Sequence, residues 1–161
     1  MKTEFGPLTI ENDILVDYAS GCVGAIHIPE GVKEIKDFAF NQCSHIEAVC
    51  FPKTLTVIGD GAFTKCSKLS AITIPNGVVE IGNYAFSDCL NLLILTMPSS
   101  LRQIGIGICH GCKNLTSVQF ACFVDGIDTD TFADCVNLNE YKVVIGCNAY
   151  VFKIPKTEAA T

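Results

Sequence analysis

The sequence predicts a solenoid, in which similar coils stack and each coil covers the apolar edge of its neighbour. Two observations predict this fold. Five cysteines recur at a constant spacing of 23 residues, and nearly every apolar residue of the central chain follows the same step without an insertion. About nine positions of each unit are apolar, more than one unit can bury alone, whereas stacked units can bury them together. The cysteines are Cys43, Cys66, Cys89, Cys112 and Cys135.

The whole chain of 161 residues is expected to form one domain. Residues 1–25 are expected to form an N-terminal cap, residues 26–142 five 23-residue repeats, and residues 143–161 a C-terminal cap with a tail. Residues 8–18 alternate in hydrophobicity around Glu11-Asn12-Asp13 and predict a hairpin in the first cap. The apolar, β-rich residues 142–155 predict a closing strand pair in the second.

Three segments are expected within each repeat. Alternation at Ile72-Thr73-Ile74 predicts a short strand, and the following proline ends it because proline has no N–H for the ladder. The Val-x-x-Ile-Gly segment predicts a second extended stretch with a turn. Apolar residues three apart in Ala-Phe-x-x-Cys-x-x-Leu favour one or two turns of α-helix or 3₁₀-helix. The predicted fold class is an α/β repeat, with short parallel strands on one side and short helical or 3₁₀ turns on the other.

The repeated pattern L-x-x-I-x-I-P-x-x-V-x-x-I-G-x-x-A-F-x-x-C resembles the BspA-like leucine-rich repeats, over residues 26–142. This resemblance implies a right-handed leucine-rich-repeat solenoid. It also implies cell adhesion, because similar repeats occur in surface proteins of bacteria and some protists that bind host or matrix proteins. A cell-surface or secreted location is implied in the same way, although the chain begins without the apolar segment of a signal peptide.

Charge and hydropathy argue against several classes of partner. The chain has a net charge of −6 and no basic patch, which argues against nucleic acid and anionic membrane surfaces. No apolar run approaches the roughly 18 residues of a spanning helix, so membrane insertion is not expected. A protein ligand is the expected partner, and the sequence leaves the oligomeric state open.

The motif Cys109-His110-Gly111-Cys112 has the spacing of a redox or zinc pair, but the repeat register explains it more simply. Cys112 is the fourth of the five cysteines that recur every 23 residues. Cys109 occupies a phenylalanine position and Ile108 an alanine position, an exchange that roughly conserves volume. Phenylalanine occupies the equivalent position at Phe40, Phe63, Phe86 and Phe132. Zinc would need two further ligands that no second pair supplies, so we expect buried, inert cysteines and no metal or cofactor.

No catalytic residues are predicted. The three histidines, His27, His45 and His110, occupy outward positions in different coils. The register brings together no Ser–His–Asp triad and no pair of carboxylates. We therefore expect that the protein is not an enzyme.

The outward residues of the repeated strand form the candidate protein-binding surface, called the strand face below. The column directly before each Ile/Phe-Pro contains His27, Cys50, Thr73, Thr96, Gln119 and Lys142. The column two residues earlier contains Ala25, Ala48, Ala71, Ile94, Ser117 and Glu140. These side chains are mostly small and uncharged, so a partner can approach closely. An ordinary solvated sheet face is the alternative for the same residues.

Three functional hypotheses follow. The first is a non-enzymatic protein-binding module that serves adhesion or recognition of host or matrix proteins through the strand face and its flanks. The second is an intracellular structural or scaffolding repeat protein, which the missing signal peptide favours. The third is a cysteine-based redox or metal protein, which the register of Cys109 and Cys112 disfavours.

Overall fold

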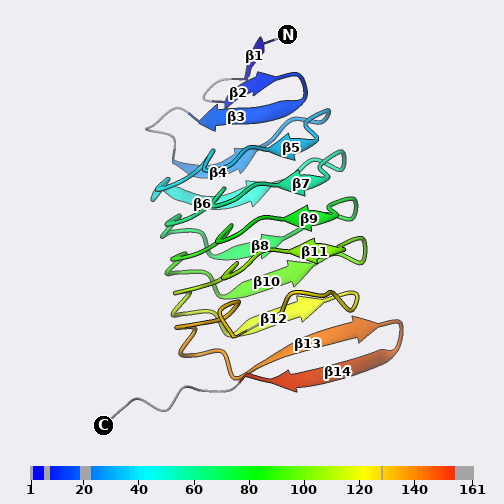
Figure 1. The fold of residues 1–161 in the computed structure, drawn as a ribbon. Coiled ribbons are helices and arrows are strands. Elements are labelled where there is room, and N and C mark those ends of the chain that lie inside the picture. The colour runs from blue at the N-terminus through cyan, green and yellow to red at the C-terminus, as the bar shows by residue number, and fades with distance from the viewer. Residues whose placement is uncertain (1, 6–7, 19–22, 128, 155–161) are drawn as a thin grey trace.

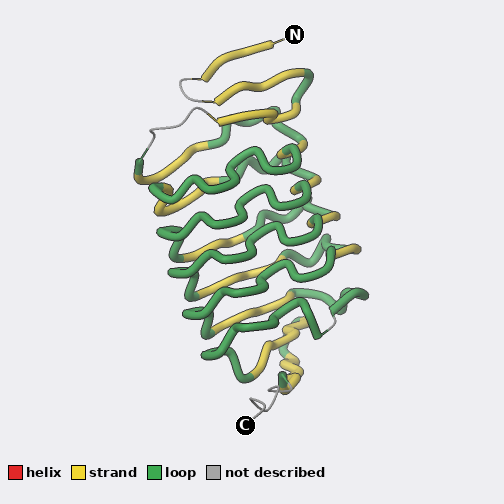
Figure 2. The backbone as a smooth tube through the Cα atoms, turned by 60° about the vertical axis from the view of Figure 1, so that its left-hand side comes forward, coloured by secondary structure: helices red, strands yellow, loops and turns green. Residues whose placement is uncertain are grey.

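The structure, a computed structural model, describes residues 2–5, 8–18, 23–127 and 129–154. The chain winds as a stack of coils between an N-terminal hairpin and a C-terminal hairpin (Figure 1). Longer strands line one side of the stack and two-residue strands line another, while turns and loops complete each coil (Figure 2). The predicted solenoid is therefore confirmed.

The described strands form three sheets. The first, in spatial order, consists of β1 (Lys2–Phe5), β2 (Leu8–Glu11), β3 (Ile14–Tyr18), β5 (Glu34–Ile35), β7 (Val57–Ile58), β9 (Glu80–Ile81) and β11 (Gln103–Ile104). The second consists of β14 (Asn148–Lys153), β13 (Glu140–Ile145), β12 (Ser117–Phe120), β10 (Ile94–Met97) and β8 (Ala71–Thr73). The third pairs β4 (Gly24–His27) with β6 (Ile46–Cys50).

Equivalent strands of neighbouring coils pair in parallel with the 23-residue offset that the sequence predicts. Thr96 aligns with Thr73 on one side and with Gln119 on the other. On the second side of the coil, Ile58 aligns with Ile35 and with Ile81. The hydrogen bonds of these ladders run along the stack, so each coil supplies the pairing partners of the next.

The turn side of each coil corrects the prediction of helical or 3₁₀ turns. In the first coil the N–H groups of Ala39, Asn41 and Cys43 donate to the carbonyl oxygen three residues earlier. Those of Phe40 and Gln42 donate instead to carbonyl oxygens of the next coil, each at 2.8 Å. A 3₁₀-helix would keep all these bonds within one coil. Successive β-turns fit the same apolar spacing and also bond the coils together.

Backbone angles explain why no helix forms there. Phe38 and Gln42 have φ values of 59° and 62°, and Tyr84 and Asp88 repeat them at 54°. A right-handed helix requires negative φ throughout. The described part of the chain contains no helix, hence none that could cross a membrane, and the fold is all-β rather than α/β.

A stack of aromatic rings runs through the core. The ring centroids of Tyr18 and Phe40 lie 5.1 Å apart, those of Phe40 and Phe63 4.8 Å, and those of Phe63 and Phe86 5.6 Å. Tyr18 belongs to β3, so the N-terminal hairpin extends the core of the repeats. In the next coil Cys109 takes the ring's position and is fully buried, beside the equally buried Ile108. The predicted exchange of volume between these two positions is compatible with this packing.

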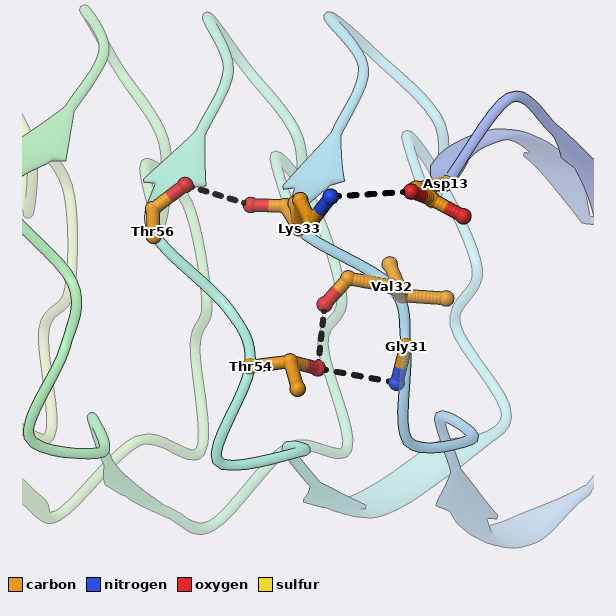
Figure 3. A network of polar contacts seen from close by, with 6 residues as sticks. All are labelled: Asp13, Gly31, Val32, Lys33, Thr54 and Thr56. Atoms are coloured by element: carbon orange, nitrogen blue, oxygen red, sulfur yellow. Dashed lines mark hydrogen bonds and ion pairs between the residues drawn. The ribbon is translucent and has the colours of Figure 1, made fainter.

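Hydroxyl groups bridge neighbouring coils outside the core, as Figure 3 shows. The hydroxyl of Thr54 accepts a hydrogen bond from the N–H of Gly31 at 3.0 Å and donates one to the carbonyl of Val32 at 2.8 Å. Lys33 forms an ion pair with Asp13 of the N-terminal hairpin at 3.0 Å. The hydrogen bonds of Thr54 connect backbone groups of a loop, which lie outside the strand ladders, to the adjacent coil.

A second polar column, here called the Asx ladder, consists of Asp37, Asp60 and Asn83. The Oδ1 atom of each accepts a hydrogen bond from a backbone N–H one coil further on: Asp60 N at 2.8 Å, Asn83 N at 2.6 Å and Ile106 N at 2.9 Å. Asn83 Nδ2 also donates to Asp60 Oδ2 at 3.2 Å. The ladder supplies these N–H groups with acceptors.

The close approach of neighbouring coils at the Asx ladder explains why glycine directly precedes this column of residues in most coils. A Cβ atom on Gly105 would lie 2.6 Å from the Cα of Asn83 and 2.5 Å from the carbonyl carbon of Gly82. The first coil has Lys36 at this position and an exposed side chain there. Glycine is therefore required where the preceding coil contributes a ladder residue, because two backbones approach closely.

Substitution of Gly105 by alanine is expected to lower the free energy of unfolding by about 2–3 kcal/mol, because neighbouring backbone must move to admit the methyl group. The matched control is Lys36→Ala, at the equivalent position of the first coil, which should change stability by less than about 0.5 kcal/mol. Urea denaturation followed by circular dichroism measures both. Similar losses for the two variants would contradict the close-approach explanation.

Candidate functional site

The repeated strand alternates between buried and outward residues, as the sequence predicts. In β8 and β10 the inward residues Ile72 and Leu95 are buried, whereas Ala71, Thr73 and Ile94 are exposed. All members of the two outward columns are exposed except two half-buried residues. These are Thr96 and Glu140.

Strand register aligns the strand-face residues into two columns. In the second sheet, Ile94 lies between Ala71 and Ser117, and Thr96 lies between Thr73 and Gln119. Lys142 continues the second column beside Gln119. In the third sheet, Ala25 pairs with Ala48 and His27 with Cys50. The structure therefore brings the candidate residues together within each of the two sheets.

The strand face is interrupted between its two sheets. β6 and β8 are in contact, but their residues do not pair in register. Contact between the coils is maintained by Ser70, directly before β8, whose N–H donates to Glu47 O of β6 at 3.4 Å. The strand face thus has an N-terminal part on β4 and β6 and a longer C-terminal part from β8 onward.

The C-terminal hairpin extends the strand face beyond the residues that the sequence indicated. β14 pairs antiparallel with β13, so Val151 lies opposite Lys142 and Lys153 opposite Glu140. Directly opposed residues share one face of a sheet. Val151 and Lys153 therefore join the two columns. The sequence does contain a signal for them. A strand pair is expected in residues 142–155, and alternation within that pair could have identified Val151 and Lys153 as outward residues.

The strand face carries few charges for so acidic a chain. Glu140 is the only acidic residue of the two columns, although the chain has 17. Lys153 Nζ donates to Glu140 Oε2 at 2.6 Å, and this bond together with the charge of Lys153 lowers the pKa of Glu140. Its carboxylate therefore stays ionised but is neutralised locally by lysine.

The largest exposed apolar side chains near the middle of the strand face belong to one coil. Leu90, Leu93 and Ile94 are 42%, 46% and 48% exposed. Ile94 projects from the strand face between the smaller Ala71 and Ser117, while Leu90 and Leu93 lie on the approach to β10. This coil therefore exposes three apolar side chains, one on the strand face and two in the segment that leads to it.

The Cys-x-x-Cys motif is buried in the core. Cys109 and Cys112 have no exposed surface. A hydrogen bond with the Cys112 thiol and burial both raise the pKa of Cys109. A reactive cysteine needs the opposite, a lowered pKa and access to solvent. Among the described residues, no group of three or more His, Cys, Asp or Glu side chains is placed to hold a metal ion.

The five cysteines at the 23-residue spacing, here called the cysteine ladder, do more than fill space in the core. The thiols of Cys66, Cys89 and Cys112 donate to the carbonyl oxygens of Phe40, Phe63 and Phe86 at 3.2, 3.2 and 3.1 Å. The Cys135 thiol donates to Cys109 O at 3.0 Å in the same way. Each thiol thus links its own coil to the preceding one. The expectation of buried, inert cysteines did not include these hydrogen bonds, because thiols are weak donors whose partners only the stacked backbone reveals.

The histidines lie apart from one another. His27 is on the strand face, His45 is exposed in the loop before β6, and His110 lies on the turn side. The nearest carboxylate oxygen to His110 is Asp134 Oδ2, 3.8 Å from Nε2. His27 and His45 are exposed, as the register predicts, whereas His110 is half-buried and its Nδ1 atom is buried.

Solved structures with this fold include bacterial leucine-rich-repeat proteins. A leucine-rich repeat protein of T. pallidum has a TM-score of 0.73 and 30% identity, over 80% of this chain and 62% of that one. A leucine-rich cell surface protein of Faecalibacterium prausnitzii has a TM-score of 0.77 and 29% identity, over 81% and 35%. The pneumococcal vaccine antigen PcpA, at 24% identity over 84% and 34% with a TM-score of 0.71, shares the fold. This chain thus spans less than two thirds of each of these three proteins.

No curated protein matches the chain. A family sequence model does match, and it agrees with the structural comparison. The sequence model of the BspA type leucine-rich repeat region (6 copies) matches residues 17–139, which include most of the stacked coils. The resemblance seen in the repeat pattern is confirmed, and the chain belongs to the BspA type leucine-rich repeat family.

Proposed function

We propose that the protein is a non-enzymatic binding module that recognises a protein ligand through the strand face and its flanks. The observation that carries the proposal is the run of exposed, small and mostly uncharged side chains on successive strands. A surface on which small side chains predominate lets a partner approach the sheet closely and costs little side-chain entropy on binding.

The flanks enter the proposal because the strand face alone is small. Six strands at about 4.8 Å spacing and two outward residues per strand give a footprint of roughly 240 Å². A standard interface buries about 800 Å² per partner. Leu90 and Leu93 on the flank, next to Ile94, provide apolar surface that a partner can bury in the same contact.

Adhesion to host or matrix proteins is the role we favour for this module. Its support is the similarity to a protein described as a leucine-rich cell surface protein. Location at the cell surface or in the secreted fraction follows from the same proposal. An intracellular scaffold would use the same strand face, so location separates the two roles: natural protein found entirely in the cytosol would contradict adhesion.

The binding test is a pull-down from an extract of extracellular-matrix proteins. Immobilised wild type is compared with a Thr73→Lys/Thr96→Lys variant, which places two long charged side chains at the centre of the strand face. We expect the variant to capture at least about tenfold less ligand than wild type, since an unpaired interfacial charge costs more than about 1.4 kcal/mol of binding free energy.

The matched control is Asn41→Lys/Gln103→Lys. Both residues are exposed, one on the turn side and the other on β11, so this variant adds the same charge away from the strand face. It should capture as much ligand as wild type. Equal capture by all three proteins would exclude the strand face as the binding surface.

A further inference from the structure

One edge of β14, the last described strand of the stack, pairs with no other described strand. β14 pairs with β13 from Asn148 to Lys153, and within the described part of the chain no strand pairs with its other edge. All of β14 is exposed, and its sequence, Asn-Ala-Tyr-Val-Phe-Lys, lacks proline and has three strand-favouring residues in succession, Tyr-Val-Phe. In Figure 1 it is the outermost strand at the C-terminal end. An exposed edge strand of this kind is a template for pairing with another chain.

An exposed aromatic cluster accompanies this edge. The ring centroid of Phe123 lies 5.2 Å from that of Tyr150 and 6.4 Å from that of Phe152. These side chains are 58%, 45% and 37% exposed. At about 200 Å² per aromatic side chain, about 280 Å² of aromatic surface is left in water. Patches near this size on monomers are often functional.

We propose that β14 pairs antiparallel with β14 of a second copy of this chain, across a two-fold axis that joins the two five-stranded sheets. With the axis at Val151, Tyr150 of one copy lies opposite Phe152 of the other, and Lys153 lies opposite Ala149. Apolar residues then meet apolar residues, and no two like charges are directly opposed. A two-fold axis brings the same surface of both copies together, so each pairing of two residues occurs twice.

Charge favours this end of the molecule for self-association. Glu140, Lys142 and Lys153 are the charged residues of the β13–β14 hairpin, two positive and one negative, which gives +1. The whole chain has a net charge of −6, so two copies repel each other over most of their surfaces. Contact through the hairpin keeps the acidic remainder of each copy away from the other and lowers that repulsion.

Area predicts a weak, reversible dimer. The exposed aromatic surface, with Val151 and Ile145 at 51% and 40% exposure, falls short of the roughly 800 Å² per partner of a standard interface. Backbone pairing along six residues adds to it. One consequence rests on the proposed function: two strand faces joined in one sheet would bind a repetitive ligand with avidity. The dimer itself does not depend on that function.

Sedimentation equilibrium over about 1–500 µM protein, with a reductant to prevent disulfides between exposed cysteines, tests the proposal. The wild-type mass should rise from 17.3 kDa toward twice that value. Val151→Lys places a lysine beside its own copy at the two-fold axis, and should shift dimerisation to at least about tenfold higher concentration. Val23→Lys, at the opposite end and 71% exposed, adds the same charge and should dimerise like wild type.

Hydrogen exchange of the wild type provides a second measurement that needs no variant. Backbone amides of β14 should become more protected as concentration rises, while those of β4 should not change. A wild type that stays monomeric over the whole range overturns the proposal. So does a dimer that Val151→Lys leaves unchanged, or β14 protection that is independent of concentration, since either places the contact elsewhere or shows the edge covered within one chain.

Discussion

Substitution of Cys112 by aspartate is expected to lower the free energy of unfolding by about 3–5 kcal/mol at neutral pH, because it places a carboxylate without a counter-ion in the core. Cys112 is fully buried, and its thiol donates to Phe86 O at 3.1 Å. A carboxylate has no proton to donate to that carbonyl, so the two oxygens face each other. Burial and the lost hydrogen bond therefore act in the same direction.

The destabilisation should depend on pH with a definite sign. In the Cys112→Asp variant, burial raises the carboxyl pKa of the folded state above the unfolded value of about 3.9. The folded state then binds the proton more tightly, so the variant loses least stability below that unfolded value and progressively more as pH rises toward the folded pKa. A protonated carboxyl can also donate to Phe86 O, as the thiol does.

Two control variants separate the charge from the hydrogen bond and from volume. Cys112→Ser keeps a donor and Cys112→Ala removes it, and both should lose less stability than Cys112→Asp and show no comparable pH dependence between about pH 4 and pH 7. Chemical denaturation at several pH values measures all three variants. Equal losses for aspartate and alanine at neutral pH would mean that the position is open to solvent.

The repeat determined how much of the fold the sequence could predict. A constant 23-residue step aligns residues such as Ile35, Ile58 and Ile81, and stacking is the arrangement that buries them all. The same step explained Cys109 as a replaced phenylalanine. These predictions needed only residue type and spacing, and both are printed in the sequence.

The turn side could not be predicted because its conformation depends on contacts between coils. Phe38, Tyr84 and Asp88 adopt positive φ, a conformation for which phenylalanine and tyrosine give no sequence signal. Hydrogen bonds to the adjacent coil offset the strain. An apolar spacing of three residues fits a 3₁₀-helix and a run of β-turns equally well, so periodicity alone could not choose between them.

The Asx ladder was missed for a related reason. Asp37, Asp60 and Asn83 differ in charge, and the fourth residue of their column is Ile106. What the first three share is a side-chain oxygen at the reach of one coil, which becomes visible only when the coils are stacked. The position of the strand face was predictable from alternation, whereas its extension onto β14 required the antiparallel register of the last hairpin.

Stability at alkaline pH is the second large effect that we expect. Burial raises the pKa of Cys66 and of Cys135 from an ordinary 9.0 to about 12. Between these values the unfolded chain loses both protons while the folded chain retains them. The free energy of unfolding should therefore be unaffected by these thiols below pH 9 and should fall above it, by about 1.4 kcal/mol per pH unit for each thiol.

Other buried thiols reinforce this effect. Burial, followed by the proximity of Cys112 and Cys66, raises the pKa of Cys89, and Cys109 shifts in the same direction. Ionising Cys89 in the fold would place a thiolate near Cys112 and Cys66 and would remove the donor from Phe63 O. The ladder that links the coils at neutral pH thus makes the folded state sensitive to base.

A Cys66→Ala/Cys135→Ala variant tests this account, because it removes two of the titrating thiols. Its stability at neutral pH should be lower, since two inter-coil hydrogen bonds and two sulfur atoms are lost from the core. Between about pH 9.5 and pH 10.5, however, its stability should fall less steeply than that of wild type, by up to about 2.7 kcal/mol per pH unit. Tyrosine and lysine titrate in both proteins and cancel in the comparison. Parallel pH profiles would show that the ladder thiols ionise within the folded protein, and would exclude the ladder as the source of alkaline instability.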